Sequence, residues 1–304
     1  MKKKVLTSLI LAATLALGTL TGCGSKSEEV TQPEQGAPAT DAADNNAGSE
    51  DKTITVGATP VPHAEILDNV VKDVLAKDGW TLETVVFQDY VLPNTSLESD
   101  ELDANYFQTL GYMNQQNEDA GLHLTAVAGI HIEPMGIYSE KYTAIADLPD
   151  GAEIGIPNDP DNGERAIDLL VQKGLLTSKG GFGTDASYTE SSLSSDKDAN
   201  PHGYKITALE AANLPLSLPD LDAAVINGNY ALEAELPAKH PALEIEDFTD
   251  ELKVKRTNFL VVKDGNQDSE KIKALVAALQ SDEVQKYIDD TYKGAVITSF
   301  IDAE

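Results

Sequence analysis

Arginine is rare in this chain, and one of its two copies stands where it could bind an anion. The segment 158–166 (NDPDNGERA) separates a predicted strand from a predicted helix and contains Arg165, whereas Arg256 lies elsewhere. A guanidinium can hold a carboxylate through two parallel hydrogen bonds, and the adjacent helix N-terminus adds amide donors for the same anion. A surface ion pair of Arg165 with Glu164 or Asp161 explains the segment equally well and would contribute little energy.

A second polar group follows an apolar run. Residues 222–231 (DAAVINGNYA) predict a buried strand that delivers Asn227 to its carboxyl end, where open α/β sheets bind ligands. The side-chain oxygen of an asparagine can accept a hydrogen bond from an ammonium group. An Asn-Gly pair is also a common turn, because both residues tolerate positive φ, and on its own this is the simpler interpretation.

Aromatic side chains gather in a third group of segments: 87–90 (FQDY), 105–108 (NYFQ) and Tyr112. Together they can form an apolar slot for an aliphatic or thioether side chain. Core packing is the alternative, and we favour it for Tyr106.

Sequence patterns of common catalytic sites are absent, including GxSxG, HExxH, the P-loop and a GxGxxG that follows a strand. The five histidines lack metal-type spacing, and we expect His123 and His131 to be structural. The sequence therefore predicts no catalytic residue, no metal site and no cofactor.

The elements that must position these residues alternate between strand and helix. We expect strands near 53–58, 80–87, 102–106, 122–128, 152–157, 222–226, 259–263 and 295–300. Helices are expected from Pro62 to a stop at Gly79, and over 162–173, 230–236, 269–280 and 282–292. This order predicts an α/β fold with parallel sheets covered by helices, interrupted by a long Ser-, Gly- and Asp-rich loop at 177–203.

The N-terminus carries a signal of its own. Lys2–Lys4 precede an apolar run, Val5–Leu20, that is too short to span a bilayer and ends in LTGC. The only cysteine of the chain, Cys23, closes this run. The leader resembles a bacterial lipoprotein signal, which implies a signal peptide over 1–22, lipidation of Cys23 and anchoring at the extracytoplasmic face of the cell membrane. An ordinary secretory leader with a chance cysteine, or an uncleaved helix, is the alternative.

Charge and composition exclude several partners. The net charge of −29 becomes −32 when the three leader lysines are removed, whereas nucleic acids and anionic membrane surfaces bind basic patches. We therefore expect no nucleic-acid partner. Residues 24–52 contain one valine and no other large apolar side chain, so 23–52 is expected to be a disordered acidic tether. The single cysteine excludes a disulfide within the chain.

Taken together, these segments resemble the NlpA lipoprotein family, the methionine-binding proteins of ABC importers. The matching segments, in family order, are VGATPVPHAEIL (56–67), QDYVLPN (88–94), DANYFQ (103–108), PMGIYSEKY (134–142), IGIPNDPDNGERAIDLL (154–170), ALEAANLP (208–215), DAAVINGNYALEA (222–234) and GAVITSF (294–300). The resemblance implies a two-lobed, periplasmic-binding-protein-like (type II) fold with the ligand cleft between the lobes. We place its two crossovers near 138 and 256, so that lobe 1 comprises 53–138 plus 257–304 and lobe 2 comprises 139–256.

The resemblance also implies roles for individual residues. Arg165 would bind the carboxylate of an amino acid, Asn162 would shape its turn and bond the ligand, and Asn227 would accept from the α-ammonium group. Four residues would line the slot for the ligand side chain: Tyr90, Phe107, Tyr112 and His63. Three more would brace the hinge or a turn: Asn158, Asn229 and Tyr138.

The expected function is that of a lipid-anchored, non-enzymatic solute-binding protein. It would bind L-methionine, with D-methionine as a further candidate ligand, and deliver it to an ABC permease with its ATPase subunits. The family usually reads FQH and then a Pro-Tyr pair, whereas this chain has Thr109 after Gln108. A dipeptide or another apolar amino acid is therefore an alternative ligand. A surface interaction lipoprotein without a transport role is a further alternative, and an extracytoplasmic hydrolase is less well supported.

Overall fold

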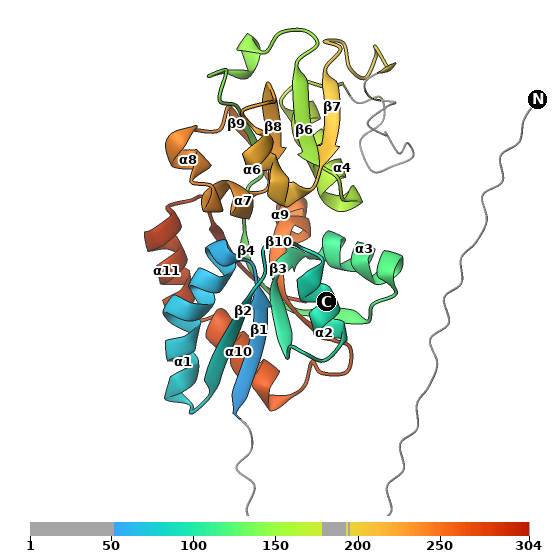
Figure 1. Cartoon of the computed structure of the whole chain (residues 1–304). Helices are drawn as coiled ribbons and strands as arrows, with labels where there is room; N and C mark the ends of the chain where they lie inside the picture. Colours follow the sequence, from blue (N-terminus) through green and yellow to red (C-terminus); the bar gives the residue numbers. More distant parts are fainter. Residues whose placement is uncertain (1–51, 178–192, 194, 304) are drawn as a thin grey trace, which may run out of the picture. The chain divides into compact units, whose positions relative to one another are not determined.

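The computed structural model describes residues 52–177, 193 and 195–303, and its strands form two sheets (Figure 1). Sheet A has the strand order β11-β4-β10-β3-β1-β2, and sheet B the order β7-β6-β8-β5-β9. The strands of sheet A are β1 (Thr53–Ala58), β2 (Thr81–Val86), β3 (Ala104–Thr109), β4 (Leu124–Ile132), β10 (Thr257–Lys263) and β11 (Ile297–Asp302). Those of sheet B are β5 (Gly136–Tyr138), β6 (Glu153–Pro157), β7 (Lys205–Leu209), β8 (Ala223–Ile226) and β9 (Glu244–Ile245). We call the parts built on sheets A and B lobe 1 and lobe 2.

Helices cover these sheets. Those of lobe 1 are η1 (Pro60–Ala64), η2 (Leu67–Val71), α1 (Lys72–Lys77), α2 (Leu92–Glu98), α3 (Leu110–Ala120), α10 (Glu270–Leu279) and α11 (Asp282–Tyr292). The remaining helices are η3 (Ile145–Asp147), α4 (Pro160–Gln172), η4 (Ala211–Asn213), α6 (Leu214–Ser217), α7 (Gly228–Glu233), α8 (Leu236–Lys239) and α9 (Asp250–Arg256). Among the described residues, no helix has the length and apolar character needed to cross a membrane. The signal peptide, Cys23 and nearly all of the expected tether lie outside the described residues, as does most of the expected loop.

Strand β10 shows why the lobe 1 sheet is covered on both faces. Leu260 and Val262 pack into the core that includes α1, α10 and α11, whereas Phe259 and Val261 pack into the core that includes α2 and α3. Successive side chains of a strand point to opposite faces, so an uninterrupted apolar run requires a core on each side. Figure 1 shows these two groups of helices on either side of sheet A.

Strand β8 is likewise buried on both faces, in the sheet of lobe 2. Ala223 and Val225 belong to one core, and Ala224 and Ile226 belong to another on the opposite face. The buried strand therefore has little freedom to shift, and it fixes the position of Asn227 directly after its carboxyl end.

The expected parallel arrangement of the sheets is only partly correct. β1 pairs in parallel with β2 and β3, and β6 pairs in parallel with β7 and β8. However, β10 is antiparallel to both β3 and β4, β11 is antiparallel to β4, and β5 is antiparallel to β8 and β9. The chain leaves lobe 1 along β4 and returns along β10, so these two neighbouring strands run in opposite directions.

The first crossover lies earlier than expected. β5 (Gly136–Tyr138) pairs with β8 in sheet B, although the sequence analysis assigned residues up to 138 to lobe 1. The connection from β4 to sheet B is therefore the segment 133–135. The chain re-enters sheet A at Thr257, directly after α9.

Candidate functional site

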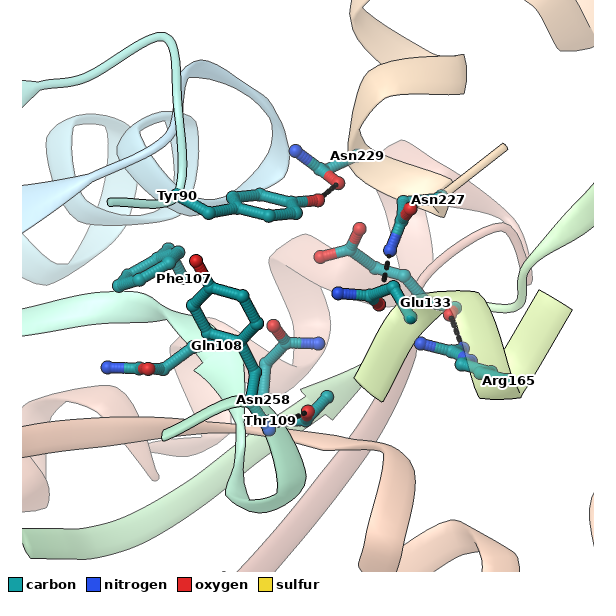
Figure 2. A pocket seen from close by; sticks show the side chains of 12 residues that line it. Tyr90, Phe107, Gln108, Thr109, Glu133, Arg165, Asn227, Asn229 and Asn258 are labelled. Carbon is teal, nitrogen blue, oxygen red and sulfur yellow. Dashed lines mark hydrogen bonds between the residues drawn. The ribbon is translucent and has the colours of Figure 1, made fainter. Parts of the chain in front are cut away.

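A cavity of about 360 Å³, part of it open to solvent, lies between the two lobes (Figure 2). Its lobe 1 lining consists of Tyr90, Phe107, Gln108, Thr109, Tyr112 and Asn258. Its lobe 2 lining consists of Asn162, Arg165, Asn227, Gly228 and Asn229, and Glu133 lies on the first crossover. The cavity thus includes six of the seven ligand-binding residues expected from the sequence, and His63 is the one that does not line it.

The start of α4 orients an amide side chain toward the cavity. Asp159 caps this helix, and its Oδ1 accepts from both the backbone N–H (2.9 Å) and the side-chain Nδ2 (3.0 Å) of Asn162. Because Nδ2 of Asn162 is held by a carboxylate, its Oδ1 faces Asn227 and accepts from Nδ2 of that residue at 2.7 Å. Oδ1 of Asn227 is left buried without a hydrogen-bond partner in the described part of the chain.

The side-chain amide of Asn229 forms a hydrogen bond between the two lobes. The Tyr90 hydroxyl donates to Oδ1 of Asn229 at 2.6 Å, and Figure 2 shows this bond. Burial raises the pKa of Tyr90, which keeps the hydroxyl protonated. Nδ2 of Asn229 is buried and finds no acceptor among the residues that the structure covers. The cavity therefore holds one unsatisfied acceptor, on Asn227, and one unsatisfied donor, on Asn229.

Arg165 reaches the cavity from the second turn of α4 and is almost fully buried. Its Nε and Nη2 donate to the Glu246 carboxylate at 3.0 Å and 2.6 Å, and Nη2 also donates to the backbone oxygen of Glu133 at 2.8 Å. Within the described chain, no hydrogen bond is found for Nη1. Glu246 thus occupies the edge of the guanidinium formed by Nε and Nη2, which can bind a carboxylate through two hydrogen bonds. Nη1 is the donor left for a ligand.

Arg165 and Glu246 each stabilise the charged form of the other. Burial tends to lower the pKa of Arg165, but the Glu246 carboxylate outweighs this effect and raises it. Burial likewise tends to raise the pKa of Glu246, and Arg165 outweighs it, so that this pKa lies below its usual range. Both groups are therefore ionised, and Arg256 lies 3.4 Å from the same carboxylate.

Aromatic rings form the opposite wall of the cavity. The Tyr90 ring lies 5.7 Å from Phe107, 5.6 Å from Tyr112 and 4.9 Å from Tyr230, measured between centroids. These separations are typical of attractive aromatic pairs. Tyr230 was not expected here; it follows Asn229 in α7 and packs onto Tyr90 across the lobe boundary.

His63 lies behind the cavity lining rather than in it. Its Nε2 is 3.2 Å from Oδ1 of Asn258 and 3.3 Å from Oε1 of Glu133, and both of these residues line the cavity. Its Nδ1 is 2.8 Å from the Thr59 hydroxyl. The expectation that His63 contacts the ligand side chain is therefore not met by its position, because lining side chains separate it from the cavity.

His131 completes the same buried group. Its Nε2 is 2.7 Å from Oε1 of Glu133, and its Nδ1 makes a short hydrogen bond with the Tyr106 hydroxyl. One ligand atom from each of His63, His131 and Glu133 lies within 4.8 Å of the others. Each of these atoms already has a hydrogen-bond partner, so the geometry is that of a hydrogen-bond network. The buried position of His131 fits the structural role expected for it.

Several lining residues were missed by the sequence analysis. Glu133 and Asn258 were not selected. Glu133 directly follows the carboxyl end of β4, the kind of position that identified Asn227, whereas Asn258 is the second residue of β10 and lies at its amino end. Tyr138 is buried in a lobe 2 core, and Asn158 is exposed; neither lines the cavity.

Comparisons with known proteins agree with this architecture. The sequence model of the NlpA lipoprotein family matches residues 54–300. A methionine-binding lipoprotein, MetQ, from Bacillus subtilis is 34% identical over 98% of each chain. A D-methionine-binding lipoprotein, MetQ, from Escherichia coli is 36% identical over 77% of this chain and 82% of its own.

A solved structure has the same fold. The nutrient binding protein from Burkholderia cenocepacia, bound to methionine, superposes with a TM-score of 0.73 and 38% identity, covering 81% of this chain and 100% of that one. The two sheets and the cavity between them are therefore those of a two-lobed, periplasmic-binding-protein-like fold. From the family match and these similarities, this chain is a member of the NlpA lipoprotein family.

Proposed function

We propose that this protein is the solute-binding component of an ABC amino-acid importer and that it binds methionine between its two lobes. The observation that carries the proposal is the pair of unsatisfied buried atoms, Oδ1 of Asn227 and Nδ2 of Asn229, in a cavity that also contains Arg165. Buried polar atoms are normally hydrogen-bonded, and a ligand with both a donor and an acceptor would satisfy the two atoms. A free amino acid supplies both, as an ammonium group and a carboxylate.

The proposed contacts follow from the free atoms. The ligand carboxylate accepts from Nη1 of Arg165 and from Nδ2 of Asn229, and the α-ammonium donates to Oδ1 of Asn227. Asn162 acts by orienting Asn227. The thioether side chain lies against Tyr90, Phe107 and Tyr112, where sulfur–aromatic contacts add to the burial of apolar surface.

The importer role extends beyond the cavity. In this proposal, the two lobes close around the ligand by a hinge motion. Lobe 1 was expected to comprise residues 53–138 plus 257–304, and the structure moves the first of these boundaries from 138 to 132. The closed form docks on a membrane permease, and separate ATPase subunits supply the energy. The chain itself is not an enzyme. Lipidated Cys23 holds it at the extracytoplasmic face of the cell membrane.

A thermal-shift screen tests the ligand. The purified protein is unfolded and refolded to remove any bound molecule, and is then heated with each of the twenty amino acids, D-methionine and methionyl dipeptides. A ligand at about a thousandfold excess over its dissociation constant stabilises the native state by about 4 kcal/mol. A selective shift with methionine supports the proposal, and no shift with any compound contradicts it.

A dipeptide is the second candidate ligand, and Thr109 favours it. Thr109 lines the cavity at the position where the family usually has histidine, so the wall is shorter there. A larger shift with a methionyl dipeptide than with methionine would retain the fold and the mechanism but change the substrate.

A further inference from the structure

Glu133 is a buried residue with a carboxylate side chain. It follows β4 on the first crossover, it is 5% exposed, and it lines the cavity. Figure 2 shows it beside Asn227. Its approach depends on Gly228, because a β-carbon there would lie 2.6 Å from Cβ of Glu133. The carboxylate therefore lies against the backbone that directly follows Asn227.

The hydrogen bonds around Glu133 have a defined direction. A carboxylate only accepts hydrogen bonds, so Nε2 of His131 carries the hydrogen and donates to Oε1 of Glu133 at 2.7 Å. Nε2 of His63 is 3.3 Å from the same oxygen, and its hydrogen bond is to Oδ1 of Asn258. The Nδ1 atom of His131 then accepts from the hydroxyl of Tyr106. The backbone N–H of Asn229 also donates to the carboxylate. His131 and the Asn229 backbone thus act as donors that fix the position of Glu133.

The same network supplies no positive charge. Burial lowers the pKa of His63 to about 4 and that of His131 to about 3, so both rings are neutral at physiological pH. The Arg165 guanidinium donates to the Glu246 carboxylate, and its hydrogen bond to Glu133 is to the backbone oxygen and not to the carboxylate. Among the described residues, Glu133 therefore has no ion pair with a charged cation. Burial accordingly raises the pKa of Glu133, and its charged form is energetically unfavourable until a cation joins it.

We propose that Glu133, held by His131 and the backbone N–H of Asn229, is the anionic partner of the ligand's α-ammonium group and makes a free amino group a requirement for binding. The inference rests on the proposed function and deepens it. An ammonium group has three hydrogens, so it can donate to Glu133 and to Oδ1 of Asn227 at the same time. Arg165 and Glu133 then match the two charges of a zwitterion.

This role sets the ligand class. Compounds that keep the carboxylate and the thioether but lack the amino group leave Glu133 buried and unpaired. N-acylated amino acids replace the ammonium with a neutral amide and add bulk at the same point. Both classes should bind poorly, whereas the L- and D-forms of an amino acid both retain the charge.

The test compares two ligands and three proteins by calorimetry. The ligands are L-methionine and its des-amino analogue, 4-(methylthio)butanoate, and the proteins are the wild type, Glu133→Gln and Glu246→Gln. A hydrogen bond to a charged group is worth about 10- to 150-fold in affinity. We expect the wild type to prefer methionine by at least this factor, and Glu133→Gln to lose most of the preference without weaker binding of the analogue. Glu246→Gln is the matched control and should weaken both ligands in parallel, because both carry the carboxylate.

Two results would overturn the inference. A Glu133→Gln protein that keeps the wild-type preference would exclude the charge as its source. A wild type that binds the two ligands within a few-fold of each other would exclude it without any variant, even if Glu133→Gln failed to fold. Failure of the proposed function is a different observation, because the wild type would then bind neither ligand.

Discussion

Gly111 and Asp161 approach each other so closely that no side chain fits between them: a β-carbon on Gly111 would lie 2.1 Å from Oδ1 of Asp161. Gly111 is in the first turn of α3 in lobe 1, and Asp161 is in the first turn of α4 in lobe 2. Thr109 donates to the same carboxylate at 3.3 Å, and Gln115 accepts from the Asp161 backbone N–H at 3.1 Å. The two lobes therefore meet at a contact that depends on a glycine.

The Gly111→Ala variant should weaken ligand binding. The added methyl group displaces the Asp161 carboxylate and opposes the contact between the lobes, and overpacking of this kind costs about 1–3 kcal/mol. We expect the dissociation constant for methionine, measured by calorimetry, to rise about 5- to 150-fold. The double variant with Asp161→Ala should recover most of the affinity. A double variant as weak as Gly111→Ala alone would place the cause in α3 instead.

The Asn227→Ala variant should lose affinity with little change in stability. Removing an acceptor for a charged ammonium costs about 1.5–3 kcal/mol of binding energy. The unfolding temperature should hardly move, because the variant leaves Oδ1 of Asn162 unsatisfied in place of Oδ1 of Asn227. Asn200→Ala is the matched control: Asn200 is buried in lobe 2 and bonds the backbone of Leu193 and Tyr204, away from the cavity. That variant should lower the unfolding temperature and leave the affinity unchanged.

The Arg165→Ala variant should abolish binding, and it should also destabilise the fold. Glu246 would remain buried without its partner, and breaking a buried ion pair in this way costs about 3–5 kcal/mol. The double variant with Glu246→Gln separates the two effects, because it removes the unpaired charge and should recover stability but not binding. Calorimetry and thermal unfolding measure both. Methionine binding by the stable double variant would contradict the proposed contact of Arg165 with the carboxylate.

The Phe107→Ala variant should bind methionine more weakly and accept a broader range of side chains. Phe107 is 4% exposed and lies against Tyr90 in the aromatic wall, so truncation enlarges the slot at the ligand side chain and not at its charged groups. A competition series of apolar amino acids of increasing size measures the effect. An unchanged order of affinities would exclude this ring as a determinant of side-chain choice.

The fold was predictable where the chain is uniformly apolar. Strands β8 and β10 are buried on both faces, so successive residues in each are apolar. The sequence analysis recognised both of these apolar runs as strands. β5 and β9 have three and two residues, which is too short for any periodic pattern. The direction of β10 was missed because strand periodicity is the same in parallel and antiparallel pairs.

The site was predictable where a residue type is rare or where it follows a strand. Arg165 is one of two arginines, and Asn227 ends an apolar run, so both were selected and both line the cavity. Glu246 is one of 51 acidic residues, and only its burial distinguishes it. Burial depends on contacts between distant segments, which no local pattern in a single sequence contains.

The unfolding free energy should fall as the pH decreases from about 6.5 toward 4, in part because of His63 and His131. Burial lowers their pKa values from 6.5 in the unfolded chain to about 4 and about 3 in the folded protein. Between these limits the unfolded chain binds more protons than the folded one, so acid favours unfolding. Each histidine contributes a slope of up to about 1.4 kcal/mol per pH unit. Denaturant titrations of the wild type and His63→Gln between pH 7.5 and 5 should differ by the slope of one histidine. Equal slopes would mean that His63 takes up its proton in the folded protein.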